Sequence, residues 1–257
     1  MSGHSKWSTI KRAKGITDAK RGQAFTKLAN AITIATKLGN SGDIDSNPRL
    51  RLAVETARGL NMPKENVQRA IDRGLGKLGG QSLEEVLYEG FGPGKVAFMV
   101  EGVTDNKNRT NNEIRNIFDK SGGHMGGVGS VAYMFDRKGE IKVDAKEGVD
   151  HDDQLLELID LGIEDVEDFD DQGKKKLLIY VEVGELSSIS KKIAEAGYIV
   201  ESSEIIYKPN LHTEIKDKET ADKVFAFIER IEDNDDIQKV FANFDISENI
   251  ISEIQGS

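Results

Sequence analysis

Residues 96–118 read VAFMVEGVTDNKNRTNNEIRNIF, and the change of pattern within this stretch decides the fold. Residues 96–103 are rich in Val, Phe and Met and are typical of a buried β-strand, whereas Ile114, Ile117 and Phe118 are spaced as on one face of a helix. Between them, Thr110 and Glu113 form a capping-box pattern. The stretch therefore predicts a strand, a polar junction and a helix that begins at Thr110.

The residues on either side extend this unit. Residues 86–91 indicate a second strand, joined to the first by the turn signal Gly92-Pro93-Gly94. The predicted helix ends at Gly122, and five glycines lie among residues 122–130. Such a run requires either positive φ angles or a close approach of the backbone to another group.

The remainder of the chain alternates between strand and helix patterns. We expect a hairpin of residues 131–135 and 140–143 around the turn 136–139, then helices at 150–161, 186–196 and 219–232, and strands at 163–169, 177–183, 198–207 and 237–244. The strands of 86–103 need partners. Residues 205–257 are therefore expected to return and complete this domain, with residues 131–204 inserted as a second one.

The N-terminal region has a different character. Residues 1–22 show little apolar periodicity and are expected to form a basic arm. From Phe25 a helix runs to Gly39; Asn47-Pro48 is a helix-start signal, and a third helix opens at Pro63 and ends at Gly74. These three helices predict a small bundle, followed by a glycine hinge.

These patterns together predict an α+β multidomain fold. It consists of an N-terminal three-helix bundle with its arm (1–80), a middle α+β domain (81–130 plus 205–257) and an inserted acidic α+β domain (131–204). The two α+β domains are expected to be small ferredoxin-like sandwiches, each with helices on one face of its sheet.

Charge is divided unevenly along the chain. Its 257 residues include 35 Lys+Arg and 45 Asp+Glu, a formal net charge of −10. Residues 1–80 hold 15 Lys+Arg and 6 Asp+Glu, a net of +9, whereas the other 177 residues hold 20 and 39, a net of −19. This asymmetry predicts that residues 1–80 bind a polyanion, whereas the acidic remainder of the chain repels it.

The basic region supplies the candidate nucleic-acid-binding residues. They are Lys6, Trp7, Lys11, Arg12, Lys14, Lys20, Arg21, Arg49, Arg51 and Arg58. Cations that neutralise phosphates release counterions, so such binding depends steeply on salt, and Trp7 is suited to stacking on bases of single strands or RNA loops. The alternative is a solvated positive face with Trp7 covering the end of the bundle.

The type of nucleic acid stays open at this point. No helix-turn-helix motif is recognised, because the loop of residues 40–46 is longer than the turn of that motif. Recognition of RNA shape or of phosphates therefore fits as well as promoter readout. DNA and ribosomal RNA, and with it the ribosome, are both candidate partners.

A second set of residues is predicted to contact a partner: Asp105, Asn106, Asn108, Arg109 and His124. Asparagine stabilises turns, and Arg109 could bind a carboxylate or phosphate near the helix N-terminus. The alternative is a capped turn with Arg109 in an internal ion pair. A position of the glycine-rich loop (122–129) nearby, or across a cleft, would favour partner contact.

Several chemistries are excluded or disfavoured. The absence of cysteine excludes disulfides, thiolate metal sites and cysteine nucleophiles. GLGKLG at 74–79 matches a dinucleotide fingerprint but follows a helix instead of a strand, and DIDSN at 43–47 begins like a calcium loop but has Pro48 where glycine must turn. The four histidines lack metal-ligand spacing. We expect no enzymatic activity, no cofactor and no metal.

Two further expectations concern location and the acidic region. No apolar run approaches the roughly 18 residues of a membrane span, and no export signal is recognised, so a cytoplasmic protein without membrane partners is expected. Residues 140–171 contain 14 acids and 2 bases. A solvated acidic surface is favoured there over a site for a cation or a basic partner.

The order of several short motifs resembles the YebC family. These motifs are SGHSKW (2–7), DAKRG (18–22), NPRLR (47–51), NMPK (61–64), YEG (88–90), TDNKNRT (104–110), GSVAYMF (129–135) and DDIQ (235–238). The resemblance covers nearly the whole chain. Two positions depart from the family pattern: Lys95 stands where glycine is expected, and Tyr207-Lys208-Pro209 replaces a more apolar approach to the proline.

The resemblance implies a fold and a role. The family consists of bacterial proteins described as probable transcriptional regulators, with a mitochondrial relative that activates translation of cytochrome oxidase subunit I. It implies three domains, with the third inserted into the second, and a cytoplasmic, non-enzymatic role in gene expression. Both promoter DNA and stalled ribosomes have been assigned as targets within the family, so the two alternatives remain.

Overall fold

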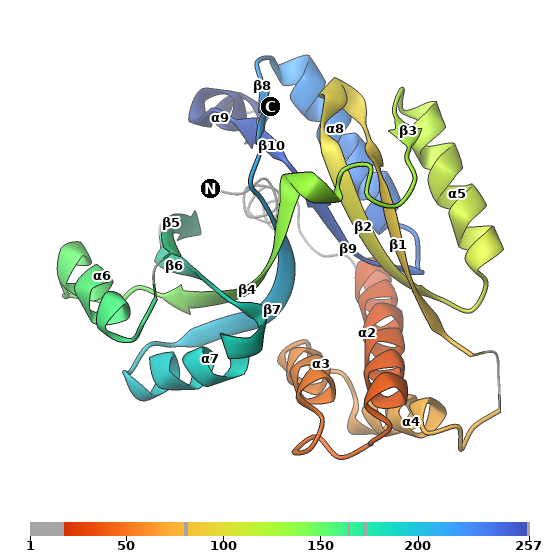
Figure 1. Ribbon diagram of the computed structural model, residues 1–257, viewed down its shortest axis with the longest axis horizontal. Coiled ribbons are helices and arrows are strands. Elements are labelled where there is room, and N and C mark those ends of the chain that lie inside the picture. Colours follow the sequence, from red (N-terminus) through yellow and green to blue (C-terminus); the bar gives the residue numbers. More distant parts are fainter. Residues whose placement is uncertain (1–17, 80–81, 164, 172–173, 256–257) are drawn as a thin grey trace.

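The computed structural model describes residues 18–79, 82–163, 165–171 and 174–255 (Figure 1). These residues form a helical bundle and two four-stranded antiparallel sheets, with a short two-stranded sheet near the C-terminus. The multidomain α+β class predicted from the sequence is confirmed. No helix within the described ranges combines the length and the apolar character needed to span a membrane.

The bundle consists of three helices with one shared core. They are α2 (Asp18–Gly39), α3 (Pro48–Gly59) and α4 (Lys64–Gly74). Both α3 and α4 pack on α2. The crossing of α2 and α4 is close: the hydroxyl of Thr33 donates to the Ala70 carbonyl at 3.0 Å, and a methyl group on Gly74 would lie 2.6 Å from the Thr33 carbonyl.

The start of α2 differs from the prediction. The helix begins at Asp18, within the region predicted to be an arm that reaches residue 22, and not near Phe25. Residues 18–24 contain good helix formers such as Ala, Lys, Arg and Gln, so the helix extends beyond the apolar stripe that the periodicity detects.

The predicted cap at Asn47 is confirmed. Its Oδ1 accepts a hydrogen bond from the Leu50 amide at 3.1 Å, and Pro48 occupies the first turn of α3. Its buried Nδ2 also donates to the carbonyls of Ala35 (2.9 Å) and Ser41 (3.2 Å). One side chain therefore both starts α3 and ties it to the end of α2.

The first sheet has the order β3-β1-β2-β9. Its strands are β1 (Glu84–Phe91), β2 (Ala97–Thr104), β3 (His124–Met125) and β9 (Ile237–Ala242). Helices α5 (Lys107–Lys120) and α8 (Lys218–Glu232) cover one face (Figure 1). Beneath them, the ring of Phe227 packs edge-on against Phe98 and Phe118, with centroids 4.8 and 4.9 Å away.

The helix after β2 starts earlier than predicted. Asn106, and not Thr110, caps α5, and its Oδ1 accepts a hydrogen bond from the Arg109 amide at 3.1 Å. Thr110 is buried inside the helix, where its hydroxyl lies 2.8 Å from that of Thr104. The capping-box pattern was misleading because the Thr110 hydroxyl contacts Thr104 in the folded chain, and the sequence spacing does not reveal this contact.

The turn between β1 and β2 contains one of the two departures from the family pattern. The 3-10 turn η1 (Pro93–Lys95) has Gly94 at a φ of 67° and Lys95 at a φ of 60°. Lys95 thus adopts a left-handed conformation that glycine reaches at lower cost. Lys95 therefore carries backbone strain that glycine would avoid at this position.

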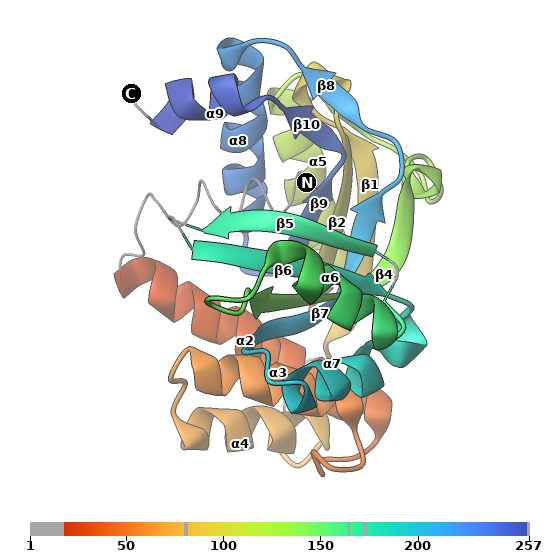
Figure 2. The ribbon, with the colours of Figure 1, turned by 90° about the vertical axis from the view of Figure 1, so that its left-hand side faces the viewer.

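The second sheet has the order β5-β6-β4-β7. Its strands are β4 (Phe135–Asp144), β5 (Asp165–Asp171), β6 (Lys174–Val181) and β7 (Val200–Pro209), and its helices are α6 (His151–Asp160) and α7 (Leu186–Glu195). The helices cover the face turned away from the first sheet (Figure 2). The predicted hairpin of residues 131–143 is wrong: residues 136–139 lie inside β4, paired with β7.

The chain between β3 and β9 builds the whole second sheet, and the two sheets share a core. Ala97, Met99 and Phe241 of the first sheet cluster with Leu178 and Ile206 of the second. Lys239 of β9 adds polar contacts, since its Nζ lies 2.5 Å from Glu204 and donates to the Ile205 carbonyl at 3.0 Å. The sheets are therefore joined by both apolar and charged groups.

The C-terminal region contains elements that the sequence did not reveal. Asn243 ends the predicted strand 237–244, because its Oδ1 accepts from the Ala97 amide (2.8 Å) and its Nδ2 donates to the Leu211 carbonyl (3.0 Å). After it, β10 (Phe244–Ile246) pairs in parallel with β8 (Thr213–Ile215), and α9 (Glu248–Gln255) follows.

Candidate nucleic-acid interface

Half of the predicted nucleic-acid-binding residues belong to the N-terminal segment. Lys6, Trp7, Lys11, Arg12 and Lys14 lie outside the described residues. Lys20 and Arg21 lie in the first turns of α2, which leads from that segment into the bundle, and their side chains are likewise outside the description. The structure therefore shows only the bundle part of the predicted surface.

Two of the three arginines predicted on α3 make internal contacts. Arg51 Nε donates to the Ile44 carbonyl at 3.0 Å, and its Nη2 donates to the Asp45 carbonyl at 2.6 Å. Arg49 forms an ion pair with Glu85 of β1. Arg51 thus fixes the loop before α3, and Arg49 connects the bundle to the first sheet.

Arg58 of α3 is exposed, as are Lys64 and Arg69 of α4, which the sequence analysis did not identify. It lies in the last turn of α3 next to the turn of residues 60–63, and Lys64 opens α4 directly after this turn. Arg58, Lys64 and Arg69 of α4 are exposed and form no ion pair with any described residue. A helical projection of α4, with Ala70 and Ile71 inward, would have identified Arg69.

The orientation of the bundle is determined by contacts with the first sheet and α8. Lys37 Nζ donates to the hydroxyl of Ser82 (2.6 Å) and the Leu83 carbonyl (2.9 Å). Gln23 Nε2 donates to the Asp233 carbonyl at 2.7 Å, at the C-terminal end of α8. These contacts hold α2 against the first sheet, and α3 and α4 lie below the sheet in the view of Figure 1.

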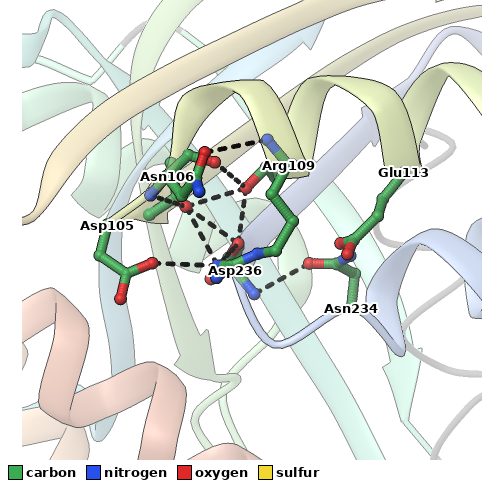
Figure 3. Close-up of polar contacts among 8 residues, drawn as sticks. Asp105, Asn106, Arg109, Glu113, Asn234 and Asp236 are labelled. Carbon is green, nitrogen blue, oxygen red and sulfur yellow. Dashed lines mark hydrogen bonds and ion pairs between the residues drawn. The ribbon is translucent and has the colours of Figure 1, made fainter.

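Three of the predicted partner-contact residues, Asp105, Asn106 and Arg109, lie in a polar junction between β2 and α5 (Figure 3). Its centre is Asp236, which precedes β9. Asp236 Oδ2 accepts hydrogen bonds from the hydroxyls of Thr104 (2.9 Å) and Thr110 (2.6 Å) and from Arg109 Nη2 (2.6 Å). Arg109 also lies 3.1 Å from the carboxylate of Asp105.

The electrostatics of the junction match this geometry. Burial by itself would raise the pKa of Asp236, but hydrogen bonds from Thr110, Arg109 and Thr104 outweigh it and lower that pKa below its usual value. The hydrogen bond and the charge of Asp236 in turn raise the pKa of Arg109. Arg109 is therefore in the internal ion pair that the alternative interpretation described, in a capped turn.

His124 does not join this junction. It lies in β3 beside Phe91, the last residue of β1, with ring centroids 5.5 Å apart. The junction adjoins the opposite end of β1, because Glu84 pairs with Thr104. Asn108 is exposed near the start of α5, whose 14 residues extend for about 20 Å. The predicted contact set is thus divided between two ends of one helix.

A buried glutamate holds the glycine-rich loop in place. Glu89 Oε1 accepts a hydrogen bond from the Gly129 amide (2.8 Å), and Oε2 accepts from the amides of Val131 and Ala132 (both 2.9 Å). The loop shaped in this way leaves Val128 98% exposed. Sequence reasoning missed Glu89; a charged residue within a strand pattern, directly before Gly90, was the available signal.

Charged and polar side chains of the described residues form ion pairs and helix caps. Within these ranges, no three His, Asp or Glu side chains gather in a way that could hold a metal ion. Arg58, Lys64 and Arg69 are exposed on the bundle and form no ion pair with another described residue. Fold and surface define a multidomain α+β protein with a cationic helical bundle.

The comparison with known proteins identifies the family. Residues 5–77 match the model of the TACO1/YebC protein N-terminal domain, and residues 83–244 match the TACO1/YebC second and third domain. The chain belongs to the TACO1/YebC family.

Its relatives have nearly the same length. A "Probable transcriptional regulatory protein" of Chloroflexus aurantiacus is 49% identical over 98% of both chains, and one of Aquifex aeolicus is 44% identical over 99% of this chain and all of its own. The crystal structure of a conserved hypothetical protein from Aquifex aeolicus superposes with a TM-score of 0.80, at 44% identity, over 90% of this chain and 93% of that one.

Proposed function

We propose that this protein is a non-enzymatic regulator of gene expression that binds nucleic acid through its basic N-terminal region. The observation that carries the proposal is the net charge of +9 within residues 1–80 of a chain whose overall charge is −10. The names of the relatives, which describe probable transcriptional regulation, support DNA as the ligand.

Contact with phosphates is the mode of binding that the bundle favours. Arg58, Lys64 and Arg69 are exposed and form no ion pair with another described residue, so they are available to phosphates. Arg49 and Arg51, by contrast, are already held by Glu85 and by loop carbonyls. Binding through these three exposed cations should thus depend strongly on salt and weakly on base sequence.

A second candidate function is a ribosome-associated translation factor that binds ribosomal RNA. Residues 60–63 between α3 and α4 have the length of a helix-turn-helix turn, so the observation in favour of this function is the connection of residues 40–47 between α2 and α3. This connection is longer than the turn of a helix-turn-helix motif. Recognition of RNA shape needs phosphate contacts and no such motif.

Crosslinking in cells, followed by sequencing of the bound nucleic acid, separates the two functions. A DNA-binding regulator yields chiefly promoter DNA, whereas a translation factor yields ribosomal RNA and sediments with ribosomes. Recovery of neither nucleic acid would contradict both candidates and leave a role in protein interactions.

Binding in vitro tests the basic region directly. Replacing Lys11, Arg12 and Lys14 together by glutamine should reduce the slope of log affinity against log salt by up to about 3 units if all three contact phosphates. Arg58→Gln, Lys64→Gln and Arg69→Gln together should act similarly if these exposed cations also contact phosphates.

The matched control neutralises three lysines of the second sheet and its helix α7. Lys175→Gln, Lys191→Gln and Lys192→Gln remove the same charge from exposed positions and should leave the slope unchanged. An equal fall of the slope in this control would show that net charge, and not the basic region, determines binding.

A further inference from the structure

The outer face of α6 has an unusual composition for a solvated helix. Gln154 and Leu158 are buried on the inner face. On the outer side, Leu156 is 60% exposed and Ile159 is 59% exposed. These two residues are three positions apart and are therefore neighbours on the surface of the helix. A helix that covers one face of a sheet normally presents polar residues to solvent, whereas α6 presents Leu156 and Ile159 there.

Carboxylates flank the two apolar side chains. Asp152 lies four residues before Leu156, and Asp160 lies four residues after it, so all four residues form one stripe along α6. Both aspartates are exposed and form no ion pair within the described part of the chain. The nearby Glu157, in contrast, already pairs with Lys146 at 2.7 Å.

The position of α6 leaves this stripe accessible. Figures 1 and 2 show the helix on the side of the second sheet that faces away from the first sheet. Residues 140–171, which include α6, contain 14 acids and 2 bases, so nucleic acid would be repelled. The complementary partner must instead carry positive charge around apolar side chains.

We propose that the stripe of Asp152, Leu156, Ile159 and Asp160 docks a basic amphipathic helix of another protein. The two aspartates are eight residues apart, which corresponds to about 12 Å along the helix. A partner helix that presents Lys or Arg at the same spacing, with leucines between them, can pair both carboxylates and cover Leu156 and Ile159.

The test uses two synthetic peptides and the isotope-labelled full chain. The first peptide is a helical 16-mer with two leucines on one face and lysines at positions eight residues apart beside them. The second, scrambled peptide has the same composition, but its leucines and lysines are distributed around the helix instead of on one face. Binding is followed by chemical shifts of the backbone amides and by a fluorescence titration at two salt concentrations.

The first peptide is expected to shift the amides of α6 and to bind at least tenfold more tightly than the scrambled peptide. Leu156→Ser with Ile159→Ser should weaken binding at least tenfold, and Asp152→Asn with Asp160→Asn should remove most of its salt dependence. Ile199→Ser, at an exposed apolar position outside α6, is the matched control and should bind as the unsubstituted chain does.

Three results would overturn the proposal. They are shifts located outside α6, equal binding of the scrambled peptide, and unchanged affinity of the Leu156→Ser, Ile159→Ser variant. Sedimentation of the chain without peptide tests whether a second copy of the chain occupies the stripe. A dimer that dissociates when Leu156 and Ile159 are replaced by serine would also overturn the proposal. All substituted side chains are exposed, and circular dichroism verifies that the variants are folded.

Discussion

Glu89 in the first sheet and Glu140 in the second are both buried, but of the two only Glu89 has hydrogen-bond donors among the described residues at both carboxylate oxygens. Three backbone amides donate hydrogen bonds to Glu89. Glu140 lies opposite Glu204 on the neighbouring strand, and its Oε2 has no hydrogen-bond partner among the described residues. Burial, and then the charge of Glu204, raise the pKa of Glu140 to about 7.

The comparison shows that the role of a buried carboxylate depends on the hydrogen-bond donors and charges around it. Amides that point at Glu89 compensate the loss of water, and the same bonds give the glycine-rich loop one defined shape. Around Glu140 the charged groups come from three strands, and they are Glu204, Lys239 and Glu167, with the hydroxyl of Tyr180 nearby. The first sheet thus uses its glutamate to order a loop, whereas the second carries one whose charge depends on pH.

The largest expected effect comes from breaking the Glu89 site. In Glu89→Gln, the amide group replaces one carboxylate oxygen, so at least one buried N–H of the loop faces another donor. We expect the free energy of unfolding to fall by about 2 to 4 kcal/mol, the cost of losing charge-assisted bonds to buried groups. Urea denaturation measures this fall.

Hydrogen exchange of the same variant locates the effect. The amides of Gly129, Val131 and Ala132 should exchange faster than in the unsubstituted chain. Leu87→Ala, at an exposed position of the same strand, is the control and should change stability by less than about 1 kcal/mol. A Glu89→Gln variant as stable as this control would contradict the assigned role.

The second effect concerns the pH dependence of Glu140. Its pKa is raised in the folded state, so the folded chain binds more protons than the unfolded chain between pH 4.5 and about 7. The contribution to stability is full below pH 4.5 and is lost as the pH rises through 7. Relative to Glu140→Gln, we expect the chain to lose about 3 kcal/mol of stability over this window.

Denaturation curves of both proteins at pH 4.5, 6 and 8 test this expectation. The variant should be relatively more stable at pH 8 than at pH 4.5. A constant difference between the two proteins across the window would show that Glu140 does not titrate there.

The smallest effect distinguishes the two main causes of the raised pKa of Glu140, which are burial and the charge of Glu204. In Glu204→Gln, the pKa of Glu140 should fall partway from about 7 toward its usual value, because burial is the larger cause and remains. Because this variant also loses the ion pair with Lys239, the expectation concerns the pH dependence: the fall of stability between pH 4.5 and 8 should be smaller by about 1 kcal/mol or less. Carbon NMR of the Glu140 carboxyl group measures the midpoint, and an unchanged midpoint would assign the whole shift to burial.

Much of the fold could be predicted from local patterns. The bundle helices, the strands β1 and β2 and the helices α6, α7 and α8 have clear periodicity, and Asn47 caps α3 as its sequence position indicates. Errors arose where a tertiary contact overrides a local signal. Residues 136–139 look like a turn but pair with β7, and Asn243 interrupts a strand to bind Ala97 and Leu211.

The sites divide in the same way. The basic N-terminal region and the acidic remainder are evident from the residues alone, because net charge is a sum over residues and does not depend on their contacts. Which of these charges are available to a partner depends on the contacts made in the folded chain. Arg49, Arg51 and Arg109 are held by partners far along the chain or by loop carbonyls, whereas Arg58 is not.

The two glutamates follow the same rule. Their identity and their place in strands are visible in the sequence, but the three amides around Glu89 and the carboxylate opposite Glu140 are brought there by folding. Hydrogen bonding and desolvation act over a few ångströms. Whether a buried charge orders a loop or titrates near neutrality is therefore decided by neighbours that only the folded chain assembles.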